Sequence, residues 1–315
     1  MKRWFGACAA FLFLIGAVAS VYAADNLVLA TGGTAGTYYP FGGAMAKIWN
    51  SKIKGMNVTA QTSGASGENV RLINKKEVEL ALVQSDTLDF AFNAKEAFKE
   101  PLKGMSTIAV LYPEIVQVVV ASAGPIKSFA DLKGKKVGVG APGSGTEANF
   151  RQLAEIYGMK KEDVNAQFLS FSESAEAYKD KHIDAFIVTA GIPNAGIMDV
   201  ATQNAIRILD IPADVAAKLT QKYPFLAAVK VPANTYKGQT ADVSTVAVNA
   251  VLIAGNSLSE AMVYDLTKAL FDNQADLASA HAKGKEVNLQ YAVKGVSIPF
   301  HPGAVKYYKE KGLMK

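Results

Sequence analysis

The sequence has 315 residues, half of them hydrophobic, with 33 Lys and Arg against 28 Asp and Glu and a single cysteine. This composition excludes a disulfide scaffold, a collagen-like repeat and a disordered polyelectrolyte, and it indicates a globular protein with room for about two lobes. The net charge of +5 is mild and the basic residues are scattered, so we expect no nucleic acid partner.

The N-terminus predicts a secretory signal peptide over residues 1–23. Lys2 and Arg3 precede an apolar stretch at residues 4–18, and Val21-Tyr22-Ala23 resembles a cleavage site with small residues. We expect cleavage after Ala23 and a periplasmic location. The only cysteine lies in this leader, so the exported chain has no thiol for catalysis, metal binding or a disulfide.

The first half of the exported chain repeats the order strand, polar turn, helix, which is typical of α/β units. The expected strands are residues 27–30, 57–61 and 79–83, and the expected helices are residues 40–50, 68–75 and a third that begins at Ser85. Two β-branched runs follow at residues 107–111 and 116–120. They are separated by Tyr112-Pro113-Glu114, where we expect the chain to cross between lobes.

The second half follows the same scheme. The expected strands are residues 135–140, 167–171, 184–188 and 207–210, and the expected helices are residues 147–157, 212–222, and two that begin at Ser172 and Pro193. A long β-branched stretch at residues 242–254 predicts the return crossing, and helices at 259–271 and 303–311 follow it. We therefore expect an α/β protein with lobe 1 formed by residues 24–115 and 250–315, lobe 2 by residues 116–249, and hinge strands between them.

Two glycine-rich turns, each between a strand and a helix, are the main candidates for a binding site. They are residues 31–39 and 138–146. Backbone N–H groups and the helix dipole at such a helix start favour an anion. The second turn matches G-x-G-x-x-G, but it lies in mid-chain and leads into a helix cap at Ser144, which disfavours a dinucleotide site. Two facing helix starts would hold a small anion; close packing and ordinary N-capping are the alternatives.

An enzymatic function has little support in the sequence. His182, His281 and His301 have no spacing for a triad or a metal site, and no G-x-S-x-G or H-E-x-x-H motif occurs. We expect these histidines at the surface or at helix caps, and we predict no catalytic residue, no metal and no cofactor. A ferric site on the phenolates of Tyr38 and Tyr39 is a weaker alternative, because spacing places no further hard ligands.

Four motifs in chain order resemble the TAXI group of TRAP transporter solute receptors. They are Gly33-Thr34-Ala35-Gly36-Thr37-Tyr38-Tyr39-Pro40, Leu82-Val83-Gln84-Ser85-Asp86, Asp131-Leu132-Lys133-Gly134-Lys135-Lys136-Val137 with Gly143-Ser144-Gly145-Thr146, and His301-Pro302-Gly303-Ala304 with Tyr307-Tyr308. The first and last are fairly specific to that group, whereas the third is shared widely among type II periplasmic binding proteins.

The resemblance implies a two-lobed type II periplasmic binding protein with a ligand cleft between lobes joined by hinge strands. Such a receptor closes on a small organic acid or amino acid, such as a glutamate-like ligand, a dicarboxylate or 2-oxoglutarate. It then delivers the ligand to a TRAP membrane permease driven by an ion gradient. We expect a monomer.

The resemblance also places the walls of the cleft. The implied wall of the first lobe consists of Thr34, Ala35, Gly36, Thr37, Tyr38, Tyr39, Gln84, Ser85 and Asp86, with Ser66 as a weaker candidate. The implied wall of the second lobe consists of Ser144, Gly145, Thr146, Thr189, Ala190 and Gly191. The arginines that follow the leader lie outside the turns, so carboxylate recognition is expected to rest on amides and hydroxyls, with a lysine as a further candidate.

Two acidic residues leave the ligand class open. Asp86 and Glu114 are nearest the expected cleft and hinge, and either could pair with a ligand ammonium, which would favour an amino acid over a keto acid. The alternatives are that Asp86 stabilises its helix N-terminus and that Glu114 is a solvated turn residue.

Two other functional classes remain. A substrate-binding protein of an ABC importer, or a sensor for another small anion, would share the fold and differ in its partner. An enzyme on the same fold is the third possibility, and the missing cysteine excludes one with a cysteine-attached pyrrole cofactor.

Overall fold

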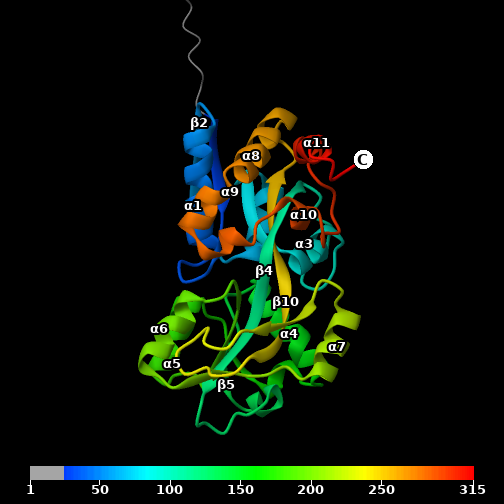
Figure 1. Ribbon diagram of the computed structural model, residues 1–315. Coiled ribbons are helices and arrows are strands. Elements are labelled where there is room, and N and C mark those ends of the chain that lie inside the picture. Colours follow the sequence, from blue (N-terminus) through cyan, green and yellow to red (C-terminus); the bar gives the residue numbers. More distant parts are fainter. Residues whose placement is uncertain (1–24) are drawn as a thin grey trace, which may run out of the picture.

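One mixed sheet runs through both lobes of the computed structural model, which describes residues 25–315 (Figure 1). The strand order is β2-β1-β3-β10-β4-β7-β5-β6, with β8 paired to β4 and β9 paired to β10. The fold is the expected two-lobed α/β architecture. The predicted leader and its cleavage site after Ala23 lie outside the described residues.

Two long strands connect the lobes. β4 (Met105–Ala121) pairs with β10 (Val243–Gly255) through residues 105–115, and then with β7 and β8 through residues 115–121. β10 pairs with β9 through residues 243–247 and with β3 through residues 250–254. Both strands therefore change partners near their middle, where the lobes meet in Figure 1.

The chain crosses between the lobes beside Tyr112-Pro113-Glu114, as expected, but the two β-branched runs are not separate, because β4 is one continuous strand of 17 residues. Pro113 stays opposite Asn249, and the register shifts beside Tyr112. Such an irregularity lets a strand accommodate a proline, which has no N–H to give to the ladder.

Lobe 1 contains both ends of the described chain (Figure 1). Its first elements are β1 (Asp25–Ala30), α1 (Tyr38–Lys52), β2 (Met56–Gln61), α2 (Ser66–Lys75), β3 (Leu80–Gln84) and α3 (Ser85–Phe92). Its C-terminal elements are α8 (Glu260–Asp272), α9 (Gln274–Ala280), the 3-10 helix η3 (Ala282–Lys285), α10 (Leu289–Ala292) and α11 (Pro302–Glu310). Trp49 of α1 and Tyr308 of α11 are fully buried on one side of the sheet, and Ile73 of α2 belongs to the other core.

Lobe 2 is formed by the middle of the chain. Its elements are the 3-10 helices η1 (Phe129–Leu132) and η2 (Lys161–Asp163), strands β5 (Lys136–Gly138), β6 (Asn165–Gln167), β7 (Ala185–Ala190), β8 (Ile206–Ile208) and β9 (Ala227–Val231), and helices α4 (Gly145–Ile156), α5 (Phe171–Lys179), α6 (Ala195–Gln203) and α7 (Ala213–Lys222). Its core includes Phe186 of β7 and Val200 of α6.

One expectation for this lobe is wrong. The predicted strand 167–171 ends at Gln167, because Ser170 and Glu173 form a capping box that begins α5 at Phe171. The helix expected to open at Pro193-Asn194 is confirmed: α6 begins at Ala195, and the Asn194 side chain accepts a hydrogen bond from the Ile197 N–H as the N-cap. Within residues 25–315, no helix combines the length and the apolar character needed to cross a membrane.

Candidate functional site

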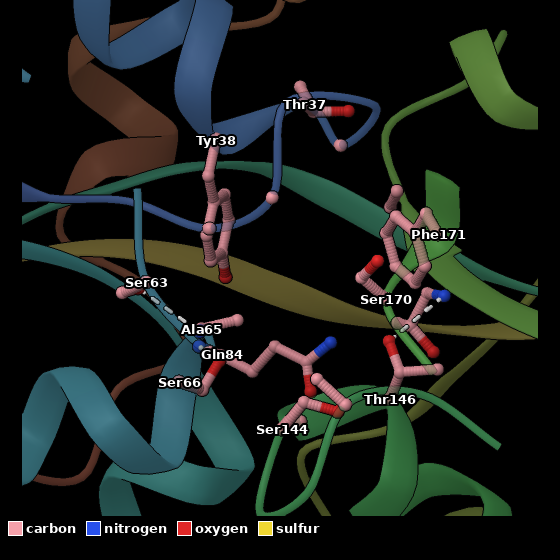
Figure 2. Close-up of a pocket in the computed structure, with 18 of the residues that line it drawn as sticks. Thr37, Tyr38, Ser63, Ala65, Ser66, Gln84, Ser144, Thr146, Ser170 and Phe171 are labelled. Carbon is pink, nitrogen blue, oxygen red and sulfur yellow. Dashed lines mark hydrogen bonds between the residues drawn. The ribbon is translucent and has the colours of Figure 1, made fainter. Parts of the chain in front are cut away.

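A pocket with an internal volume of about 60 Å³ lies between the lobes, and the beginnings of four helices line it (Figure 2). The lining residues from lobe 1 are Gly32, Gly33, Gly36, Thr37, Tyr38, Ser63, Gly64, Ala65, Ser66, Gln84 and Glu114. Those from lobe 2 are Ala141, Ser144, Gly145, Thr146, Ser170, Phe171, Thr189 and Ala190.

The helix starts come from both lobes. α1 and α2 reach the pocket through Thr37 and Ser66, and α4 and α5 reach it through Ser144 and Ser170. The two lobe 2 serines are N-caps, and their hydroxyls accept hydrogen bonds from the N–H groups three residues on, at 3.2 Å and 3.3 Å. The other first-turn N–H groups of a helix have no partner within it, so each start carries partial positive charge toward the pocket.

The pocket has no basic side chain: none of its lining residues within the described chain is Lys, Arg or His. The three described arginines are used elsewhere. Arg71 donates to the Gly67 carbonyl at 2.8 Å, Arg151 pairs with Glu147, and Arg207 donates to the carbonyl of Ile126. The described lining therefore offers an anion amides and hydroxyls, and the expectation that these groups recognise it stays a prediction.

Glu114 and Tyr38 form a buried pair in the wall of the pocket. The Tyr38 hydroxyl donates to Glu114 Oε2 at 2.6 Å, and Glu114 is only 2% exposed. Burial raises the pKa of Glu114 to about 8, and the hydrogen bond from Tyr38 opposes that rise. The alternative that Glu114 is a solvated turn residue is therefore wrong, because continuous pairing of β4 keeps it inside the sheet.

Two buried polar groups in the lining have an atom without a protein partner. Gln84 and Thr189 are 2% and 3% exposed. Within the described chain, Gln84 Oε1 accepts no hydrogen bond, and Thr189 Oγ1 neither accepts nor donates one. In Figure 2 the Gln84 side chain extends toward Ser144 and Thr146 of the opposite lobe. An unpaired buried polar atom raises the free energy of the folded state. Both atoms are therefore candidate hydrogen-bond partners for a ligand or water in the pocket.

Asp86 is not part of the lining. It is fully buried at the start of α3, and its Oδ2 accepts hydrogen bonds from Asn149 Nδ2 at 2.9 Å and Gln152 Nε2 at 3.0 Å, both on α4. Its Oδ1 accepts from the Thr87 N–H at 2.6 Å. Burial raises the pKa of Asp86, and these hydrogen bonds oppose the rise. Asp86 therefore connects lobe 1 to lobe 2. We call the three residues Asp86, Asn149 and Gln152 the interlobe cluster.

Five further residues implied by the resemblance also lie outside the lining. Thr34 and Tyr39 are exposed, and Tyr39 points away from Tyr38, which removes the paired phenolates that a ferric site would need. The Ala35 carbonyl accepts a hydrogen bond across the lobes from Asn194 at 3.0 Å.

The remaining two, Ser85 and Gly191, contact other residues. Ser85 Oγ accepts a hydrogen bond from the Asn249 N–H at 3.3 Å. A Cβ on Gly191 would lie 2.8 Å from Lys283 Cε and 3.1 Å from Thr37 Oγ1, so the close approach of the lobes requires a glycine there.

Sequence reasoning missed several lining residues, and most had a signal. They are Gly32, Gly33, Ser63, Gly64, Ala65, Ala141, Ser170 and Phe171. Residues 63–67 form a polar, glycine-containing turn before a helix, like the two turns that were chosen. The Ser170 and Glu173 spacing is that of a capping box and predicts a third helix start of the same kind.

The histidines have capping or surface positions, as expected. His281 Nδ1 accepts a hydrogen bond from the Lys283 N–H at 3.1 Å, and His301 Nδ1 accepts one from the Gly303 N–H at 3.2 Å. His182 is exposed. Among residues 25–315, no group of three or more His, Cys, Asp or Glu side chains is arranged to hold a metal ion.

Solved structures of low sequence identity share the fold. A protein of Bordetella bronchiseptica RB50 is 16% identical, with a TM-score of 0.56 over 90% of this chain and 88% of that one. The alkanesulfonate-binding protein SsuA from Xanthomonas axonopodis pv. citri, bound to MOPS, is 13% identical, with a TM-score of 0.52 over 92% of each chain. A putative L-cystine ABC transporter from Listeria monocytogenes is 14% identical, with a TM-score of 0.52 over 84% of this chain and 98% of that one.

At these identities the solved structures establish the fold alone. The sequence itself matches a family model: residues 29–312, nearly the whole described chain, fit the one for the NMT1-like family. This chain therefore belongs to the NMT1-like family.

Proposed function

We propose that this protein is a periplasmic solute receptor that binds a small carboxylate or amino acid between its lobes and delivers it to a membrane transporter. The observation that carries the proposal is the convergence of four helix starts, two from each lobe, on one pocket without a basic side chain. Such a set of N–H groups and hydroxyls suits a small carboxylate group. The fold, which solved binding proteins share, supports a receptor over an enzyme.

Binding is coupled to closure in this proposal. A ligand that contacts Thr37 and Ser66 on one side and Ser144 and Ser170 on the other binds the closed form better than the open form, so it shifts the population toward closure. The motion occurs where β4 and β10 change partners, and it moves residues 24–115 with 250–315 against residues 116–249. Closure excludes water and strengthens each polar contact.

For the transporter, we propose a TRAP permease, on the motifs that resemble the TAXI group. The alternative is an ABC importer, which solved structures of the same fold favour, since two are named as an alkanesulfonate-binding protein and an ABC transporter component. Co-expression with the permease encoded beside the receptor gene decides between them. Uptake that needs an ion gradient supports the TRAP partner, and uptake that needs ATP supports the ABC partner.

A thermal-shift screen tests the receptor function. The protein is first unfolded and refolded to remove a co-purified ligand, and then screened with amino acids, 2-keto acids, C4 to C6 dicarboxylates, sulfonates and ferric citrate. A ligand at 100 times its dissociation constant stabilises the folded state by about 2.7 kcal/mol, which raises the melting temperature by several degrees. A shift confined to small carboxylates is the expected result, and no shift with any of them would contradict the proposal.

A further inference from the structure

We propose that the ligand is a zwitterionic α-amino acid with an uncharged side chain, whose ammonium group binds Glu114 and whose carboxylate lies at the starts of α4 and α5. The inference rests on the proposed receptor function and narrows it to one ligand class. It assigns two parts of the lining different roles: Glu114 is the acceptor, and the helix starts at Ser144 and Ser170 are the donors.

The first argument is charge balance. Glu114 is the only Asp or Glu among the described lining residues, and the same lining has no cation. A dicarboxylate would place two negative charges in a buried space beside Glu114 without a counter-ion, and uncompensated buried charge is expensive. An amino acid with an uncharged side chain has no net charge, and each of its two charged groups has a complementary end of the pocket.

The second argument is the match of donors and acceptors. The carboxylate of the ligand accepts hydrogen bonds, which the first-turn N–H groups of α4 and α5 and the hydroxyl of Thr189 supply. An ammonium only donates, so it needs acceptors. Glu114 provides one once it is ionised, and an ammonium supplies the positive charge that pairs with the carboxylate, whereas a keto acid has no cationic group.

The third argument concerns the electrostatic surroundings of Glu114. It faces Tyr38 of α1, Tyr112 on its own strand, Asp86 of α3 and Lys283 of η3. Lys283 donates to Glu286 Oε1 at 2.6 Å, so its charge is already partly compensated, and Asp86 adds to the rise in the pKa of Glu114. The site around Glu114 therefore favours an added positive charge.

This arrangement predicts that binding releases a proton. The ligand-free pocket holds Glu114 mainly as the neutral acid at pH 7, because burial raises its pKa to about 8. An ammonium beside it favours the carboxylate, so the Glu114 O–H bond breaks and the proton passes to the buffer. Release of most of one proton per bound ligand is expected at pH 7.

Matched ligand pairs and calorimetry test the inference on the protein expressed from its complete sequence. L-alanine is compared with pyruvate, L-valine with 2-oxoisovalerate, and L-glutamate with 2-oxoglutarate, in phosphate and in Tris at pH 7. We expect an uncharged amino acid to bind at least tenfold more tightly than its keto acid, with a binding enthalpy that differs between the buffers by the released proton.

Substitutions test whether Glu114 is the group that binds the ammonium and releases the proton. Glu114→Gln is expected to weaken amino acid binding roughly ten- to a hundredfold and to abolish proton release, because the amide cannot pair with an ammonium as a carboxylate does. Glu310→Gln is the matched control: Glu310 Oε2 accepts from the Tyr264 hydroxyl at 2.8 Å, far from the pocket at an exposed site. If Glu114→Gln does not fold, Tyr38→Phe, with Tyr264→Phe as its control, should weaken binding less and leave proton release intact.

The outcomes separate this inference from the proposed function. Keto acids or dicarboxylates that bind as tightly as the amino acids, or binding without proton release, would overturn the inference and leave the receptor function standing. A preference for L-glutamate over L-alanine and L-valine would overturn it equally, because the pocket would then tolerate a second negative charge. Failure of every carboxylate to bind would overturn the proposed function itself.

Discussion

Two groups of buried polar side chains lie between the lobes, and they differ in their hydrogen bonding. In the interlobe cluster, both oxygens of Asp86 accept hydrogen bonds, and two of the four donor groups belong to Asn149 and Gln152 of the opposite lobe, although Asn149 Oδ1 has no partner in the described chain. In the pocket, Gln84 Oε1 and Thr189 Oγ1 have no partner among the described residues, although both residues are as buried as the cluster. The Asp86 carboxylate therefore joins the two lobes, whereas the two pocket oxygens are available to the proposed ligand.

The comparison shows how two neighbouring residues take different roles. Gln84 ends β3 and Asp86 lies in the first turn of α3, so the same strand-to-helix junction supplies both. The pocket decides which ligand binds, and the cluster contributes to how firmly the closed form is held once the ligand is there. Variants that affect one group and spare the other test this division.

The largest effect is expected from Gly67→Ala, which should prevent closure. A Cβ on Gly67 of α2 would lie 2.1 Å from the Gly143 carbonyl oxygen of lobe 2, which is too close for the closed form. We expect ligand binding to fall at least roughly a hundredfold, since the competent closed form is lost. The open protein should not be destabilised, because Ala is the better helix former. Calorimetry and thermal unfolding measure both.

Gly43→Ala is the control for that variant. A Cβ on Gly43 of α1 would meet no atom within 4 Å, so the substitution changes a helical glycine without touching the opposite lobe. Unchanged ligand affinity in both variants would show that the described contact between the lobes is not needed for binding.

A smaller effect is expected from Asp86→Asn, which weakens the interlobe cluster. Asn149 and Gln152 donate to the same oxygen of Asp86, and an amide oxygen in its place accepts from both without the negative charge. The new NH2 group then faces the Thr87 N–H, so the cluster loses the charge and one acceptor, and ligand affinity should fall roughly tenfold. Asp89→Asn is the control on the same helix: Asp89 is 3% exposed, but its partners Asn93, Lys95 and Ser297 all belong to lobe 1. Titration calorimetry measures the ligand affinity of both variants. Equal losses of affinity would show that the interlobe cluster has no specific part in ligand binding.

The sequence predicts the position of the pocket better than the contacts within it. The turns before α1 and α4 are recognisable because glycine, serine and threonine before a helical pattern mark a helix start, and both reach the pocket. The sequence could not separate Gln84 from Asp86. Both are polar residues of one motif, and only the packing of α4 against α3 draws Asp86 away from the pocket.

The continuity of β4 was also beyond sequence reasoning. Pro113 is a correct signal for an interruption, but β4 stays paired with β10 on both sides of it, through a register shift that skips Leu111 of β4. The same pairing buries Glu114, which a local pattern places in a turn. The pairing of β4 with β10 therefore buries Glu114, which is the one carboxyl group in the described lining of the pocket.

The pH dependence of stability should report on Glu114. Its pKa is about 8 in the closed protein and near 4.5 when unfolded, so between these values the folded state binds the additional proton. The free energy of unfolding then falls as pH rises from 5 to 8, by at most about 1.4 kcal/mol per pH unit. Glu114→Gln should flatten this slope in urea unfolding at pH 5.5 and 8. Parallel slopes for both proteins would contradict the burial of this carboxyl group.

The smallest effect is expected from removing one cap. Ser144→Ala removes the N-cap of α4 and should cost about 1 kcal/mol of stability. Ser259→Ala removes the N-cap of α8, outside the pocket, at a similar cost. Only Ser144→Ala should also lower ligand affinity, by a few fold, because Ser144 lines the pocket. A loss of affinity in both variants would indicate a general effect of stability on binding.

The distance between the lobes tests the central claim most directly. The only cysteine, Cys8, lies in the predicted leader, so a protein expressed from residue 24 onward can carry two spin labels, at Lys47→Cys on α1 and Gln203→Cys on α6, both exposed positions. The account predicts that the amino acid with the largest thermal shift moves the measured distances to one short, narrow distribution, and that Gly67→Ala prevents the change. A distribution that stays the same with bound ligand, or that shortens equally in Gly67→Ala, would contradict closure of the lobes on this pocket.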